Sequence, residues 1–145
     1  MPDKPVRIQC FGNFEVFVKG EPLRFLRSKC KELLAFLVDR RGGCCGAAEI
    51  ADALWEDGIY DRSRQKQFSV IRADLIKSLK LAEAEYILAV NRDSLAVKPE
   101  EFDCDYYMML AGDSVAINSF AGEYMSAYPW AEFTTAAITD KYSMA

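Results

Sequence analysis

The chain has 145 residues, enough for one cored domain of about 100 residues and a smaller attachment, but too few for two full domains. Apolar residues make up 51% and charged residues 28%, a balance that is typical of a folded globular protein and excludes a largely disordered one. No apolar run approaches the roughly 18 residues of a membrane span, and the chain does not start with the apolar segment of a secretory signal, so we expect a cytoplasmic protein with no membrane partner.

The formal net charge of −4 is unevenly distributed along the chain. Residues 1–99 carry 17 Lys and Arg against 14 Asp and Glu, whereas residues 100–145 carry one Lys against eight acids. The total charge argues against a nucleic-acid partner, but the positive first part keeps one open. We therefore expect two regions with different partners, divided near residue 100.

The first 25 residues predict β-structure, because apolar and polar side chains alternate. Residues 6–10 and 14–18 both follow this pattern, and a two-residue turn at 12–13 joins them into a hairpin. A second turn at 19–20 leads into a short third strand at 23–25.

Two helices are predicted next. Apolar residues over 30–38 recur with helical spacing, with Ser28 as the N-cap and the glycines at 42–43 as the stop. The second helix places its apolar residues over 47–55 on one face and closes at Gly58.

The third predicted helix, residues 61–81, is the most basic segment of the chain. Between Arg62 and Lys80 it carries six basic residues and a single acid, Asp74. One side is apolar and the opposite side is free to face solvent or a ligand. The apolar side consists of Phe68, Ile71, Leu75 and Leu79. Arg72 lies near this apolar side and is expected to extend its charged end outward.

A second hairpin is predicted over residues 86–98, with its turn at 91–94. Strands, three helices and a hairpin follow one another in the order of a winged helix-turn-helix. The predicted fold class is therefore α+β: an N-terminal antiparallel β-sheet, three helices and a C-terminal β-hairpin wing in residues 1–99, followed by a short α-helical segment.

That last segment, residues 100–145, is acidic and aromatic. It predicts one helix from Phe102 to Gly112 and another that opens at Pro129 and runs through Ile138. Nine of the 18 aromatic residues lie here, which is too many for a loose tail.

Several segments in this order resemble the OmpR/PhoB-type winged helix. The closest branch is that of SARP-like antibiotic-regulatory proteins and of response regulators with a bacterial transcriptional activator domain. The resemblance implies a transcription regulator of the two-component signalling type that binds double-stranded DNA. The matching segments are 6–16 (VRIQCFGNFEV), 27–37 (RSKCKELLAFL) and 53–55 (ALW), and 102–107 (FDCDYY) with 120–125 (FAGEYM) for the start of the activator domain.

The free side of the third helix is expected to bind the major groove, which admits one α-helix whose side chains reach base edges and phosphates. Val70 and Ala73 would touch thymine methyl groups. The other interpretation is a charged face that only contacts water. The candidate residues are Lys66, Ser69, Val70, Ala73 and Lys77, with Arg62 and Arg64 near the mouth of the groove.

Three further cations are candidates for phosphate and groove contacts. Arg27 and Lys29, at the start of the first helix, would hold phosphate beside backbone N–H groups, or are surface charges only. The resemblance implies that the hairpin tip reaches the minor groove, where a narrow groove attracts Arg92. The other interpretation is that residues 91–94 form only a turn, with no contact to DNA.

The C-terminal segment has two interpretations. In the first, its aromatic residues form a packing cover on the winged helix. The resemblance to the activator domain implies instead a protein-contact surface, for RNA polymerase or for a second copy on tandem half-sites. Its anchors would be Tyr106, Tyr107, Trp130 and Phe133.

Neither catalysis nor a cofactor, metal or small-molecule ligand is predicted. The chain has no histidine, and its five cysteines show no CxxC spacing, so reduced thiols are expected, the adjacent Cys44 and Cys45 included. The predicted function is sequence-specific DNA binding by a transcription regulator. The alternative is a protein–protein interaction module of winged-helix architecture that does not bind DNA.

Overall fold

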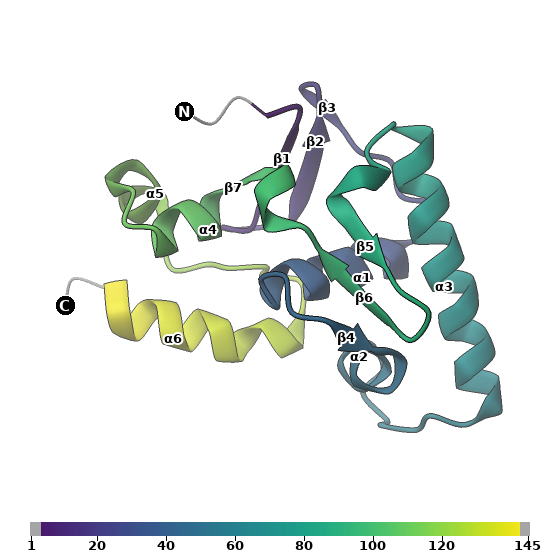
Figure 1. The fold of residues 1–145 in the computed structure, drawn as a ribbon. Coiled ribbons are helices and arrows are strands. Elements are labelled where there is room, and N and C mark those ends of the chain that lie inside the picture. The colour runs from purple at the N-terminus through teal and green to yellow at the C-terminus, as the bar shows by residue number, and fades with distance from the viewer. Residues whose placement is uncertain (1–3, 143–145) are drawn as a thin grey trace. The chain divides into compact units, whose positions relative to one another are not determined.

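The computed structural model describes residues 4–142 (Figure 1). These residues divide into two compact units. The composite unit joins the N-terminal residues up to Pro22 with the C-terminal segment from Phe102, and the central unit is the continuous stretch Leu23–Glu101. The second of these divisions falls near the expected boundary at residue 99. The first was not expected, because the N-terminal strands group with the C-terminal segment. Among the described residues, no helix is both long and apolar enough to cross a membrane.

The composite unit is built on a four-stranded sheet, in the order β3-β2-β1-β7. β1 (Val6–Gln9) and β2 (Glu15–Val18) pair antiparallel, which confirms the first hairpin. β7 (Asp103–Cys104) pairs with β1 in parallel, so the two ends of the chain share one sheet.

The third strand begins earlier than predicted. β3 (Glu21–Pro22) pairs with β2, with Val18 opposite Glu21, whereas residues 23–25 form no strand. Lys19 and Gly20 have φ angles of 52° and 82°, the left-handed conformation that both residues of a tight hairpin turn adopt. A two-residue turn places the next strand directly after it, at Glu21.

The helices of the composite unit have different bounds from those predicted. The first is α4 (Asp105–Leu110), which starts after Phe102 because β7 occupies the intervening residues. α5 (Ser114–Ser119) was not predicted; the Asp113 side chain caps it by accepting a hydrogen bond from the Ala116 amide. A turn of 3₁₀-helix at Pro129–Ala131 leads into α6 (Glu132–Tyr142), as the proline suggested.

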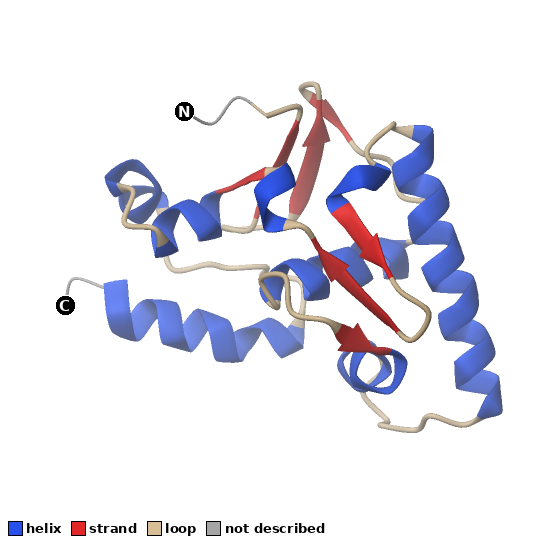
Figure 2. Ribbon diagram, in the orientation of Figure 1, coloured by secondary structure: helices blue, strands red, loops and turns tan. Residues whose placement is uncertain are grey.

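The central unit contains three helices followed by a hairpin, as predicted (Figure 2). The helices are α1 (Ser28–Asp39), α2 (Ala47–Leu54) and α3 (Arg62–Leu81). The strands β4 (Cys45–Gly46), β5 (Leu88–Val90) and β6 (Ser94–Val97) form a sheet in the order β4-β6-β5.

Some boundaries of the central unit differ from the prediction. Ser28 is the first residue of α1, and Arg27 takes the cap position without a side-chain hydrogen bond. α2 ends at Leu54, before the predicted stop. Tyr86 lies in a 3₁₀ turn (Glu85–Ile87) rather than in the hairpin. Another 3₁₀ turn, Pro99–Glu101, follows β6.

α1 is the centre of this unit. It contacts α2, α3 and β6, and every residue from Leu33 to Val38 is buried. A helix surrounded on several sides loses the polar face that a surface helix keeps. α3 instead buries one side only, the predicted one: Phe68, Ile71, Leu75 and Leu79.

Candidate nucleic-acid interface

The outer side of α3 is exposed along most of its length. α3 begins at Arg62 because the Asp61 side chain caps it, accepting a hydrogen bond of 2.9 Å from the Arg64 amide. We call the outer side of α3 the exposed residues Lys66, Ser69, Val70, Ala73 and Lys77. Val70 exposes 47% of its surface, although it is apolar and lies mid-helix. The structure therefore places all five predicted groove residues where a ligand can reach them.

Four of the predicted DNA-contact cations have no partner. Within residues 4–142, the side chains of Arg62, Lys66, Lys77 and Arg92 form no ion pair, hydrogen bond or ring contact. All four residues are exposed. Asp74, the only acid within α3, is paired elsewhere. These charges are therefore available to an external anion.

Arg64 differs from Arg62 because its side chain is fully engaged. Its Nη1 and Nη2 atoms donate to the two carboxylate oxygens of Asp57 at 3.1 and 3.0 Å, and its Nε donates to Gln67 at 2.8 Å. The guanidinium lies 4.7 Å from the centre of the Trp55 ring, and the side chain is only 14% exposed. The hydrogen bonds from Arg64 lower the pKa of Asp57. Arg64 therefore fixes the connection between α2 and α3.

Lys29 and Arg27 are also held within the central unit. The Lys29 ammonium donates to the Leu54 carbonyl and to Glu32, and it lies 5.5 Å from the centre of the Trp55 ring. Arg27 pairs with Asp74 at 2.6 Å. Trp55 thus lies beside two of the predicted DNA contacts. Its position at the end of an apolar helix face gave no signal of this role.

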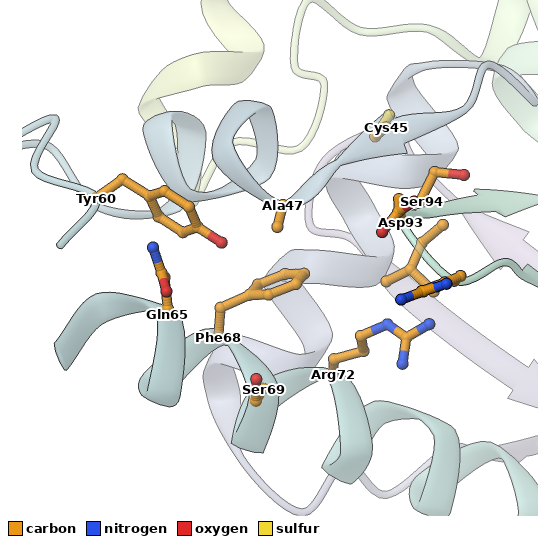
Figure 3. A pocket seen from close by; sticks show the side chains of 11 residues that line it. Cys45, Ala47, Tyr60, Gln65, Phe68, Ser69, Arg72, Asp93 and Ser94 are labelled. Carbon is orange, nitrogen blue, oxygen red and sulfur yellow. The ribbon is translucent and has the colours of Figure 1, made fainter. Parts of the chain in front are cut away.

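A hollow of about 340 Å³ lies between α3, the start of α2 and the β5–β6 hairpin. In Figure 3, Phe68 lies between Tyr60 and Gln65 at one end of this hollow and Arg72 at the other. Arg72 Nη2 donates to the Asn91 carbonyl at 2.8 Å and so joins α3 to the hairpin tip. Arg72 thus extends outward from the packed side, as expected.

The unpaired arginine of the hairpin also lines this hollow. Arg92 follows Asn91 in the turn, so the Arg72 contact anchors the backbone next to it. A shallower hollow of about 400 Å³ lies at the start of α3 and is lined by Arg62, Gln65, Lys66 and Ser69. Unpaired cations therefore border both hollows.

The four proposed protein-contact residues lie in the composite unit and have different exposures. Tyr106 is buried, and its ring meets that of Tyr124 at 5.0 Å in a T-shaped contact. Tyr107 and Trp130 are half-buried; Trp130 stacks on Tyr128 at 5.3 Å. Phe133 is 87% exposed. Three of the four side chains therefore pack within their own unit.

The thiols of the central unit differ in exposure. Cys30 and Cys45 are buried, and desolvation raises the pKa of each thiol to about 11. Cys44 is exposed. None of the five cysteines of the chain forms a disulfide.

Comparisons with known proteins show the fold. No protein family and no curated protein matches the sequence. Among solved structures, Mycobacterium tuberculosis EmbR in complex with a low-affinity phosphopeptide is similar, with a TM-score of 0.71 and 18% sequence identity. The match covers 97% of this chain but only 43% of the EmbR chain. The protein therefore shares the mixed α/β fold of less than half of EmbR.

Proposed function

We propose that the central unit is the DNA-binding part of a transcription regulator, with α3 in the major groove of double-stranded DNA. The observation that carries this proposal is the separation of the cations into two sets. Arg64, Lys29 and Arg27 pair with or stack on residues of the same unit. Arg62, Lys66, Lys77 and Arg92 are exposed and have no partner among the described residues. Unpaired exposed cations are the groups that gain most from phosphate, because binding releases the counterions of DNA.

The dimensions of α3 suit a groove. Its 20 residues extend over about 30 Å, and Lys66 and Lys77 are separated by about 16 Å along the axis. Between them, Ser69, Val70 and Ala73 are small, so the helix backbone can approach base edges closely. In this arrangement the lysines position the helix on phosphates, and the small residues contact the bases.

The hairpin completes a winged helix-turn-helix in this proposal. α2 and α3 form the helix pair, and β5 and β6 follow α3 as the wing, with Arg92 at its tip for the minor groove. The hydrogen bond from Arg72 to Asn91 supports this role because it holds the tip beside α3. The shared fold with part of EmbR is consistent with the assignment. The function is binding, with no chemical step.

The test is selection of duplexes from a random library, followed by mobility shift across a salt series. A Lys66→Ala/Lys77→Ala variant is compared with Lys98→Ala/Lys141→Ala, which removes the same charge outside α3. We expect an enriched motif for the natural chain. The slope of log affinity against log salt should fall by about 2 in the first variant and stay unchanged in the second.

A folded sample that binds no duplex at low salt would overturn the proposal. The same holds if both variants lose affinity equally, since the loss would then reflect total charge and not α3. In that case we would assign the protein the alternative function, a protein–protein interaction module of winged-helix architecture that does not bind DNA. RNA polymerase or a second copy of the chain is the partner proposed for its composite unit, through the exposed Phe133.

A further inference from the structure

Two buried thiols meet in the sheet of the composite unit. Cys10 follows β1 and Cys104 ends β7, and their Sγ atoms are 3.5 Å apart. The parallel pairing sets Cys104 opposite Ile8. Since Cys10 is two residues after Ile8, both thiols project from the same face of the sheet. Their exposed fractions are 0% and 1%.

We propose that Cys10 and Cys104 form an intramolecular disulfide when the protein meets a thiol oxidant such as a peroxide. Because both thiols are buried, the two-residue β1–β7 pairing must open locally before the peroxide reaches them. One cysteine then attacks the peroxide as its thiolate, which with the returned proton gives a sulfenic acid and one water. The second thiol attacks the sulfenic sulfur, forms the S–S bond and releases a second water. The two cysteines together lose two electrons and two protons, and the peroxide is reduced.

The two sulfur atoms must move toward each other for this bond to form. A disulfide bond is about 2.05 Å long, so the two sulfur atoms must approach by about 1.5 Å. Asp105 holds the two segments together, because its carboxylate accepts hydrogen bonds from the Cys10 amide at 2.8 Å and the Phe11 amide at 3.0 Å. This contact fixes the residue after Cys104 to the backbone of Cys10.

A metal ion fits the same three residues less well. The Sγ atoms of Cys10 and Cys104 and a carboxylate oxygen of Asp105 lie within 4.8 Å of one another. They are three ligands, one fewer than a closed tetrahedral zinc site requires, and no fourth joins them among residues 4–142. The Asp105 oxygens already accept three backbone N–H groups, from Cys10, Phe11 and Tyr106. A disulfide needs no further ligand.

The consequence of the bond follows from where the two cysteines lie along the chain. They are 94 residues apart, and the whole central unit lies between them in sequence. β7 pairs with β1 over only two residues, so this end of the sheet has few hydrogen bonds of its own. A crosslink that closes so long a loop removes many conformations from the unfolded chain. Oxidation therefore stabilises the composite unit against unfolding.

The experiment oxidises the whole chain with hydrogen peroxide or with oxidised glutathione. The variant Cys44→Ser serves as the starting protein, because the exposed Cys44 would otherwise crosslink two chains. Peptide mapping without reductant should identify one linked pair containing Cys10 and Cys104. The thermal midpoint of unfolding should rise by about 5 °C or more and return to its first value with dithiothreitol.

The control variant is Cys44→Ser/Cys104→Ala, which should lose both the linked peptides and the thermal shift. If this variant does not fold, the peptide map of the parent protein decides alone. The proposal would be overturned if Cys10 and Cys104 could still be alkylated after the protein had been treated fully with oxidant and then unfolded. So would one tightly held zinc ion per chain that protects both thiols, since the cluster would then be a metal site. Neither result depends on DNA binding.

Discussion

The central and composite units use charge in opposite ways. The central unit has 14 Lys and Arg against 13 Asp and Glu, and its cations divide into those that support the fold and those that have no partner. The composite unit has four cations against nine acids, and one acid, Asp105, lies inside it as an acceptor for backbone amides. The comparison teaches that the pairing of individual side chains, and not net charge alone, determines which cations remain available to an external anion.

The largest effect is expected from the packed side of α3. Leu75 is fully buried, so Leu75→Ala should lower the free energy of unfolding by about 3 kcal/mol through lost burial and the cavity left behind. Denaturant melts followed by circular dichroism measure this. The control is Val70→Ala on the outer side, for which a change within about 0.5 kcal/mol is expected. Equal losses at both positions would mean that α3 is covered on both sides.

Arg62 and Arg64 sharpen the distinction between free and engaged cations. Arg64→Ala should destabilise the central unit by about 1 kcal/mol, because the guanidinium no longer covers the Trp55 ring. Arg62→Ala should leave the melting temperature unchanged. It should weaken duplex binding several-fold, because one phosphate contact is lost. Melting curves and mobility shifts on both variants separate the roles. A loss of stability in Arg62→Ala with no loss of binding would reverse the assignment.

The half-buried acid of the composite unit, Asp105, predicts a pH dependence. Burial raises the pKa of Asp105, so the folded protein binds this proton more tightly than the unfolded chain does. The contribution of Asp105 to the free energy of unfolding is therefore fully present below the unfolded pKa of about 4 and falls as the pH rises through the folded pKa. Asp105→Asn does not titrate. Urea melts measure the free energy of unfolding of both proteins. The difference, natural chain minus variant, should decline from pH 4 to 7, and an increase would contradict the prediction.

The smallest effect concerns the thiols of the central unit, and it leaves stability and binding unchanged. At neutral pH iodoacetamide should modify Cys44 in the folded protein, whereas Cys30 and Cys45 should react only after unfolding. The reason is that burial raises the pKa of both thiols to about 11. Mass spectrometry of the labelled peptides measures the order of reaction. Early labelling of Cys30 would indicate that α1 opens readily.

Much of the fold was predictable because the relevant patterns are local. The helical spacing of Phe68, Ile71, Leu75 and Leu79 predicted the packed side of α3, and the alternation at residues 6–18 predicted the first hairpin. β7 was missed because a two-residue strand leaves no periodicity; only its partner β1, far away in sequence, makes it a strand.

The candidate site was predictable in part. Exposure of the outer side of α3 follows from the same helical period that buries the opposite side. The distinction between Arg62 and Arg64 could not be predicted in this way. It depends on Asp57 and Trp55, which precede α3 and approach it only in the folded chain.

The sequence by itself determined the three helices and the hairpin of the central unit and the basic character of α3, since periodicity and composition act over a few residues. The tertiary structure decided which cations remain unpaired and that the two chain ends share a sheet, bringing Cys10 to Cys104. The physical reason is that ion pairs, strand pairing and thiol contacts act over a few ångströms in space, and folding alone brings residues 94 positions apart within that range.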